Sequence, residues 1–174
     1  RVIQPLMAAI EMVHTYSLVH DDLPAMDNDQ YRRGKLTTHA KYGHAMGVLA
    51  GDGLLNYAFE TAAEAFDKST DLRRTAKALQ ILSRKAGIYG MIGGQVVDVQ
   101  STGRAIDQEE LDFIYELKTG ALLEAAMMVG AVLAGASEEE VSVIEKVASD
   151  VGIAFQIRDD ILDVTSTLEE LGKP

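Results

Sequence analysis

Proline scarcity is the feature that most constrains how this chain can fold, because proline occurs only at positions 5, 24 and 174. A proline inside a helix removes a hydrogen bond and clashes with the preceding turn, so nothing of this kind interrupts a helix between Ala25 and Lys173. Long helices are therefore permitted. Pro24 should end the first helical segment just after Asp21 and Asp22, since the residue before proline avoids the helical conformation.

Apolar periodicity predicts helices on both sides of this break. The first segment carries apolar side chains at roughly helical spacing, at Leu6, Ile10, Val13 and Leu18. Ala- and Leu-rich patterns over Gly43–Phe66 and Leu72–Ile92 fit two further helices, joined by the polar loop Asp67–Asp71. Long stretches of the chain thus have the 3.6-residue pattern of amphipathic helices.

Capping signals mark later helix ends. Two pairs have the spacing of capping boxes and predict helix starts near Gln108 and Glu138: Asp107 with Glu110, and Ser137 with Glu140. Gly135 should end the helix between them. The one strand-like run, Gln95–Gln100, alternates weakly and has no nearby pairing partner. We therefore predict an all-α fold.

Composition limits the class of protein. A chain of 174 residues with 47% hydrophobic residues fits one domain, and the absence of cysteine leaves oxygen and imidazole ligands for any metal. The net charge of −11 argues against binding to nucleic acid or an anionic membrane and favours a cation as partner. The most apolar stretch, Ala121–Ala136, is interrupted by Glu124 and is shorter than the ~20 residues that span a bilayer, so it indicates a buried helix.

The run Asp159-Asp160-Ile161-Leu162-Asp163 is the first candidate site. Positions four apart on a helix lie about 40° from each other, so Asp159 and Asp163 form one acidic face. Mg²⁺ prefers oxygen ligands and is usually held by a few carboxylates together with phosphates and water. A metal and phosphate site fits this cluster, and a solvated acidic surface is the alternative reading.

The second candidate is Asp21-Asp22-Leu23-Pro24-Ala25-Met26-Asp27. It cannot form one helical stripe, because Pro24 interrupts it, and Asp27 must come from the following loop. Read alone, this cluster could be an acidic turn at a helix end. Two aspartate clusters with metal-ligand spacing in one small all-α chain are much less expected by chance than one. The presence of both clusters therefore favours a metal site.

Basic residues accompany the acidic clusters. Arg32-Arg33-Gly34 follows closely after Asp27, and guanidinium groups match phosphate oxygens bidentately; surface ion pairs with Asp27 or Asp29 are the alternative. Lys118-Thr119-Gly120 lies inside a strongly apolar helical pattern, where glycine costs about 1 kcal/mol relative to alanine. A locally opened helix that exposes Lys118 to a polyanion would explain both the lysine and the glycine in this apolar segment.

These motifs together resemble the trans-isoprenyl diphosphate synthase (polyprenyl synthetase) family, and most of all its bacterial farnesyl diphosphate synthases. The resemblance covers Arg1 to Pro174 and also includes Ala50-Gly51-Asp52, Gly93-Gly94-Gln95-Val96-Val97-Asp98, Phe155-Gln156 and Gly172-Lys173-Pro174. It implies one antiparallel helical bundle around a deep central cavity, the isoprenoid synthase fold. The resemblance also implies that residues 1–174 form a single domain, incomplete at both ends relative to the family.

The resemblance also implies a reaction and its participants. An allylic diphosphate (dimethylallyl or geranyl) would ionise and be condensed with isopentenyl diphosphate, with about three diphosphate-bridged Mg²⁺ ions acting as Lewis acids. The protein would be cytoplasmic, without stable membrane insertion, and homodimeric.

Each motif residue takes an implied role. The expected metal ligands are Asp21, Asp22, Asp27, Asp159, Asp160 and Asp163. Lys118 and Lys173 would stabilise the leaving pyrophosphate. Thr119 and Gln156 would present oxygens to the carbocation, Arg33 would bind isopentenyl diphosphate, and Arg32 would help to bind a diphosphate.

Product length should depend on the helix below the first cluster. Ser17 lies about 6 Å and Tyr16 about 7.5 Å below Asp21 along a helix. In this family, a bulky aromatic at the position of Tyr16, together with the two-residue insertion in the first aspartate motif, is associated with a farnesyl product. We therefore favour farnesyl diphosphate, with geranylgeranyl diphosphate second and Tyr16 as an ordinary core residue as the alternative.

Other functional classes remain to be compared. His20-Asp21 is the dipeptide of the HD-type metal phosphohydrolases, although this motif leaves the other clusters unexplained. We expect His20 to be a packed or capping imidazole and not a metal ligand. A terpene cyclase would normally replace the second aspartate cluster, and a non-catalytic subunit of a heteromeric synthase would be expected to lose aspartates.

Overall fold

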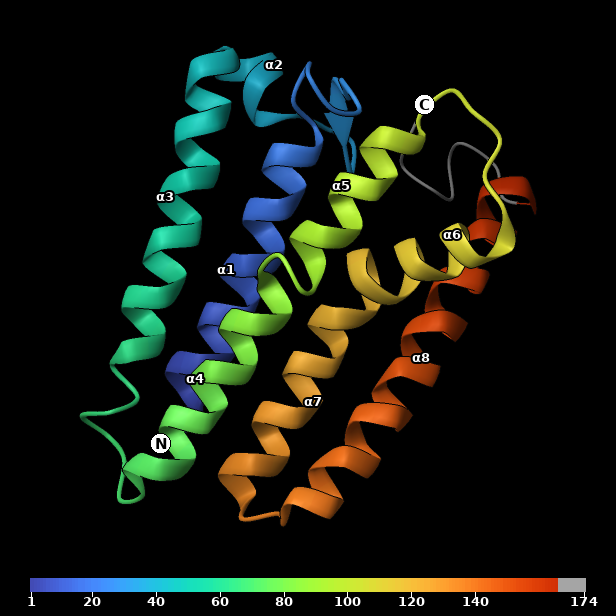
Figure 1. Cartoon of the computed structure of the whole chain (residues 1–174). Helices are drawn as coiled ribbons and strands as arrows, with labels where there is room; N and C mark the ends of the chain where they lie inside the picture. The colour runs from blue at the N-terminus through green and yellow to red at the C-terminus, as the bar shows by residue number, and fades with distance from the viewer. Residues whose placement is uncertain (166–174) are drawn as a thin grey trace.

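The computed structural model describes residues 1–165, without the side chains at positions 163 and 164. Its long helices run roughly parallel or antiparallel to one another (Figure 1). Helix α1 (Ile3–Asp21) packs against α3 (His44–Ala63), and α7 (Ala121–Ala134) lies between α4 (Leu72–Ala86) and α8 (Glu138–Thr165). The prediction of an all-α bundle is confirmed.

The chain reverses direction after α1 through a turn and a small hairpin. As Pro24 predicted, α1 ends at Asp21, and the N–H of Asp27 then donates to the carbonyl oxygen of Asp21 at 3.0 Å. Strands β1 (Tyr31–Arg32) and β2 (Lys35–Leu36) pair antiparallel. Their connection, Arg33-Gly34, has φ angles of 52° and 74°, and two positive φ values define a type I′ turn that matches strand twist. The sequence did not predict this hairpin. Helix α2 (Thr38–Tyr42) follows.

The predicted helix Leu72–Ile92 is wrong in one respect, because the structure divides it. Helix α4 ends at Ala86 and α5 (Met91–Ser101) begins after a turn. Gly90 explains the break: a Cβ atom at this position would lie 2.0 Å from the carbonyl oxygen of Lys85, so only glycine permits so tight a turn.

The capping predictions are confirmed. Helix α6 (Gln108–Ile114) begins after Asp107, whose side chain accepts a hydrogen bond from the backbone N–H of Glu110 at 2.9 Å. Ser137 and Glu140 form a reciprocal capping box at the start of α8, with N···O distances of 2.8 and 3.2 Å. Gly135 ends α7 with a φ of 103°.

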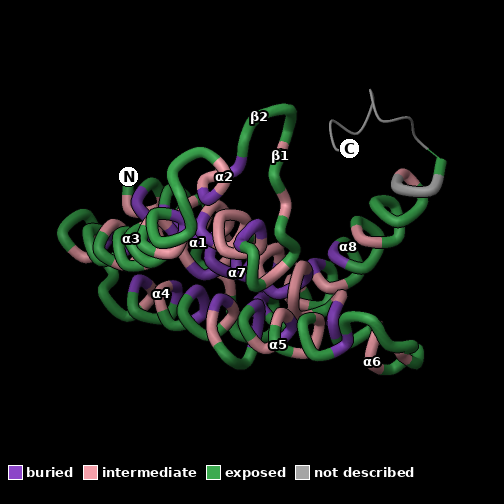
Figure 2. Tube along the Cα trace, turned by 90° about the horizontal axis from the view of Figure 1, so that it is seen from above, coloured by how far each residue is buried: buried purple, intermediate pink, exposed green. Residues whose placement is uncertain are grey.

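Buried residues gather between α1, α4 and α7, whereas α6 and much of α8 are exposed (Figure 2). Leu6, Val13, Leu82 and Val129 are among the fully buried large side chains. Alanines lie at many of the other core positions and allow helices to pack closely. One core charge is paired: Glu124 on α7 is 4% exposed and accepts a hydrogen bond from Lys85 on α4.

The continuous helical stretch Gln108–Ala134 is the one part of residues 1–165 that is long and apolar enough to cross a membrane. It includes η1 (Tyr115–Gly120), a π-helical segment between α6 and α7. Its α7 portion buries Glu124 and packs against α4, α8 and α1, as a core helix of a globular protein does. The expectation of a buried helix in this region is confirmed.

Candidate active site

A cavity of about 930 Å³ lies between α1, α5, η1, α7 and α8. Its walls are largely apolar, with side chains such as Leu55, Met91, Val96, Leu122 and Phe155. Asp21, Gln95, Lys118 and Thr119 form a polar end of this cavity. Further polar side chains in the lining are those of Glu11, His14, Ser17, His20 and Gln100. A pocket of this size and composition suits a molecule with a long apolar part and a charged end.

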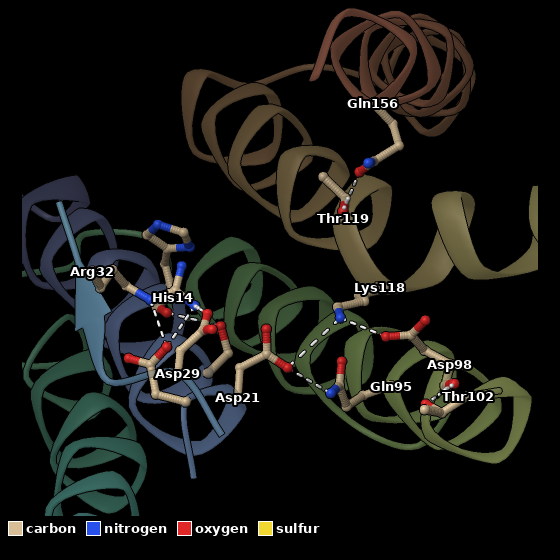
Figure 3. Close-up of polar contacts among 12 residues, drawn as sticks. His14, Asp21, Asp29, Arg32, Gln95, Asp98, Thr102, Lys118, Thr119 and Gln156 are labelled. Atoms are coloured by element: carbon tan, nitrogen blue, oxygen red, sulfur yellow. Dashed lines mark hydrogen bonds and ion pairs between the residues drawn. The ribbon is translucent and has the colours of Figure 1, made fainter. Parts of the chain in front are cut away.

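Lys118 is the central charge of the polar end. Its Nζ lies 2.6 Å from Oδ2 of Asp98 on α5 and 3.6 Å from Oδ1 of Asp21 on α1 (Figure 3). Gln95 also donates from Nε2 to Oδ1 of Asp21 at 2.7 Å. Burial alone would lower the pKa of Lys118, but the hydrogen bond to Asp98 and the neighbouring negative charges raise it above its ordinary value. Lys118 therefore remains a fixed positive charge.

The π-helical conformation of η1 directs Lys118 into the site. Segments of π-helix are rare and occur frequently at functional sites. The segment is held closely on two sides: a Cβ at Gly94 of α5 would lie 2.3 Å from the backbone nitrogen of Lys118, and a Cβ at Gly152 of α8 would lie 2.9 Å from Cα of Gly120. This conformation agrees with the local helix opening predicted at Lys118-Thr119-Gly120.

Asp22, which is buried, forms an ion pair with Arg32, whose side chain is partly exposed. Arg32 donates from Nε to Oδ1 of Asp22 at 2.8 Å, and its Nη2 lies 2.6 Å from the same oxygen. This hydrogen bond is the main cause of the raised pKa of Arg32. The surface partner considered from the sequence, Asp29, is more distant at 3.9 Å. Arg33, at the hairpin turn, is exposed and does not line the cavity.

Asp27 lies in the loop after α1, as the position of Pro24 predicted. Its carboxyl group has more negatively than positively charged neighbours. Although Asp27 is exposed as a whole residue, partial burial of its carboxyl group and the negative charge of Asp21 raise its pKa, while Lys118 acts in the opposite direction. A cation bound next to Asp27 would relieve both unfavourable effects. Asp27 thus has the chemistry of a cation ligand.

The second cluster is connected to η1 by a chain of hydrogen bonds. Thr119 donates from Oγ1 to Oε1 of Gln156 at 3.1 Å, and Gln156 donates from Nε2 to Oδ1 of Asp160 at 3.1 Å. Tyr115 donates from its hydroxyl to Oδ2 of Asp160. Burial and this contact raise the pKa of Tyr115 to about 12. Asp159 is exposed on α8.

Two of the predicted site residues cannot be placed. The side chain of Asp163 and all of Lys173 lie outside the described residues. Within the described part of the chain, no three histidine, aspartate or glutamate side chains lie close enough together to hold a metal ion. Because Mg²⁺ is usually bound by few carboxylates with phosphates and water, this oxygen-rich arrangement still fits Mg²⁺ delivered with a diphosphate.

The product-length and packing residues lie on α1 below Asp21. Tyr16 and Ser17 both line the cavity, and the Tyr16 ring, 5% exposed, contacts the edge of His20. Nε2 of His20 lies 3.0 Å from the carbonyl oxygen of Val48. This contact agrees with a packed imidazole. A metal-binding histidine of an HD-type phosphohydrolase would need a free ring nitrogen, and here Nε2 is already engaged by Val48.

Sequence reasoning assigned no role to three residues that the structure places in the site: Gln95, Asp98 and Tyr115. Gln95 and Asp98 appeared only as part of a family signature, although their i, i+3 spacing on α5 puts them on one face. Nothing in the local sequence marks Tyr115, since its contact with Asp160 joins residues far apart in the chain.

The fold and the site define a helical protein that places paired acidic and basic groups at the polar end of a deep apolar cavity. The chain belongs to the polyprenyl synthetase family, whose pattern it matches over residues 1–174. It is 45% identical to farnesyl diphosphate synthase of Geobacillus stearothermophilus over 98% of this chain and 57% of that protein. It is 49% identical to geranylgeranyl diphosphate synthase of Cyanophora paradoxa over 97% of this chain and 56% of that protein.

A solved structure agrees with these relatives. The crystal structure of geranyltransferase from Helicobacter pylori, complexed with magnesium and isoprenyl diphosphate, matches with a TM-score of 0.90 and 40% identity. The match covers 98% of this chain and 55% of the other. The chain thus spans a little over half the length of the proteins it resembles.

Proposed function

We propose that this protein is a magnesium-dependent prenyl diphosphate synthase, which condenses isopentenyl diphosphate with dimethylallyl or geranyl diphosphate. The observation that carries the proposal is the position of Lys118, paired with Asp21 and Asp98 at the polar end of the 930 Å³ apolar cavity. The cavity suits a growing hydrocarbon chain, and the polar end suits its diphosphate. Family membership and the substrates named for related proteins support the same conclusion.

The carboxylates of both clusters are the proposed metal ligands. They are Asp21, Asp22, Asp27, Asp159, Asp160 and Asp163, and we propose about three Mg²⁺ ions for the complete site. When bound, Mg²⁺ supplies Lewis-acid stabilisation of the negative charge that develops on the leaving diphosphate. The raised pKa of Asp27 supports this assignment, since a nearby cation would offset the burial and the negative charge of Asp21 that cause it.

The chain's own residues prepare the substrate for ionisation. Departure of the diphosphate leaves an allylic carbocation, which the double bond of isopentenyl diphosphate attacks before a proton is lost. Lys118 and Lys173 stabilise the departing charge, while Arg32 and Arg33 bind diphosphate groups. Oxygens of Thr119 and Gln156 face the carbocation, and the apolar walls keep water from it.

We further propose farnesyl diphosphate as the product. Tyr16 lines the cavity about one and a half helical turns below Asp21, where its ring obstructs further elongation. Geranylgeranyl diphosphate is the second candidate, because the small side chain of Ser17 lines the same cavity and a geranylgeranyl synthase is among the similar relatives. Product length therefore depends on whether the Tyr16 ring or the space next to Ser17 controls the path of the chain.

Assembly and location belong to the same proposal. We propose a cytoplasmic homodimer that does not insert stably into a membrane and binds no nucleic acid. Sedimentation of the complete protein tests the dimer, and a monomer across the micromolar range would refute it.

The direct test is to incubate the complete protein with Mg²⁺, geranyl diphosphate and isopentenyl diphosphate, and to identify the products by mass spectrometry. Farnesyl diphosphate with release of pyrophosphate is the expected result. Orthophosphate release without condensation would favour a phosphohydrolase. A complete lack of turnover, with substrate binding retained, would favour a non-catalytic subunit.

A further inference from the structure

The contact between the start of η1 and the second aspartate cluster gives Tyr115 a role that its sequence position does not indicate. We propose that Tyr115 is a positioning residue, which orients Asp160 and thereby the acidic face of α8 for binding of the metal and diphosphate. The inference rests on the proposed function, since it concerns how the same site is organised.

Both carboxylate oxygens of Asp160 receive hydrogen bonds from the protein. The hydroxyl of Tyr115 donates to Oδ2, and Nε2 of Gln156 donates to Oδ1 at 3.1 Å. Oε1 of Gln156 accepts from Thr119 at 3.1 Å. Tyr115 and Thr119 are four residues apart on one element, and Gln156 and Asp160 are four apart on the other. The contacts therefore form a ladder between η1 and α8, part of which is visible in Figure 3.

The ladder fixes the rotation of α8 about its axis. Adjacent residues on an α-helix point about 100° apart, so an anchored Asp160 also determines the direction of Asp159. Asp159 and Asp160 are both exposed, but Asp160 also accepts hydrogen bonds from the protein. Asp160 therefore holds the acidic face in place, while both carboxylates remain accessible to the metal and diphosphate.

Tyr115 also connects the two sides of the site. It begins the same π-helical segment that carries Lys118, and Lys118 pairs with Asp21 of the first cluster. The tight glycine contacts on both sides of η1 leave this segment little freedom to shift. Consequently, the hydroxyl of Tyr115 sets α8 relative to a segment that is already fixed against the first cluster.

Residues that orient metal ligands from outside the ligand shell typically change metal affinity by about 10- to 100-fold when they are removed. Tyr115→Phe removes only the hydroxyl and keeps the ring. The probe is inorganic pyrophosphate, titrated calorimetrically into the complete protein at a series of Mg²⁺ concentrations. We expect the Mg²⁺ concentration needed for half-maximal pyrophosphate binding to rise about tenfold. Saturating Mg²⁺ should restore most of the turnover, so that the loss falls on Mg²⁺ dependence rather than on kcat.

Tyr57→Phe is the matched control, because Tyr57 is 57% exposed on α3, away from the site. This control should leave the Mg²⁺ dependence unchanged. A purely structural role for Tyr115 would lower the urea midpoint of unfolding without changing the Mg²⁺ dependence, and this outcome would overturn the proposal.

A double substitution identifies the residue through which Tyr115 acts. If it acts through Asp160, Tyr115→Phe should have no further effect on Mg²⁺ dependence in an Asp160→Ala background. Additive effects of the two substitutions would overturn the proposal. Failure of the unaltered protein to bind pyrophosphate with Mg²⁺ would refute the proposed function itself, and this inference with it, and is recognised before any variant is made.

Discussion

Gly94→Ala is the substitution that tests most directly how the site is built. Gly94 lies in α5, where a Cβ atom would be 2.3 Å from the backbone nitrogen of Lys118 and 2.8 Å from the carbonyl carbon of Leu117. Because non-bonded carbon atoms prefer separations of about 3.5 to 4.0 Å, α5 and η1 would have to move apart by roughly 1 Å. Both contacted atoms belong to the backbone, so no side-chain rotation can relieve the clash.

Two opposing effects determine the size of the loss. Overpacking a close contact typically costs about 1–3 kcal/mol, while alanine in place of glycine inside a helix gains about 1 kcal/mol. Since the added Cβ meets the backbone of η1, which cannot rotate away, we place the overpacking cost at the upper end and expect a net destabilisation of about 2 kcal/mol. Gly130→Ala in α7 is the control, because no atom lies within 4 Å of its added Cβ, and it should stabilise the chain by up to about 1 kcal/mol.

Urea unfolding, followed by far-ultraviolet circular dichroism, measures both variants. In the complete protein, Gly94→Ala should also weaken Mg²⁺-dependent pyrophosphate binding, because the shift displaces Lys118 from the first cluster. The reasoning is refuted if Gly94→Ala is as stable as Gly130→Ala, since the close approach of α5 to η1 would then have no energetic consequence.

Three further predictions concern charge and cavity shape. Asp27→Asn should stabilise the metal-free protein at pH 7. The raised pKa of Asp27 means that its charged form opposes folding, so the stability of the unaltered protein falls as pH rises through the titration of Asp27. The urea midpoints of the two proteins should therefore converge at low pH. Lys85→Met should destabilise by about 3 kcal/mol in the same assay, because it leaves Glu124 buried without its cation; an unchanged midpoint would contradict this. Tyr16→Ala should yield products longer than farnesyl diphosphate by mass spectrometry, and an unaltered product would eliminate the ring as the limit.

Local signals in the sequence predicted the helix ends well where the physical cause is local. Pro24 ends α1 near the expected residue, and Gly135 and the Ser137–Glu140 box mark the junction of α7 and α8. The break after Ala86 was missed, because apolar periodicity continues through it and the requirement for Gly90 comes from a close approach in three dimensions. The Arg33-Gly34 turn was missed for a related reason, since arginine is not among the residues that typically occupy a positive φ.

The acidic and basic motifs could be identified from the sequence, but their pairing could not. Lys118 is far in sequence from both Asp21 and Asp98, and only the folded arrangement of α1, α5 and η1 brings the three together. Unit charges 4 Å apart attract by about 4 kcal/mol at an effective dielectric constant of 20, and the burial of Lys118 offsets part of this attraction. Under the proposed function, Mg²⁺-diphosphate would preserve the charge balance. The anion would take the place of the carboxylates at Lys118, and the metal would take the place of Lys118 at the carboxylates. The pairing would thus favour a ligand that brings both charges together, and neither Mg²⁺ nor a bare diphosphate alone should bind as tightly.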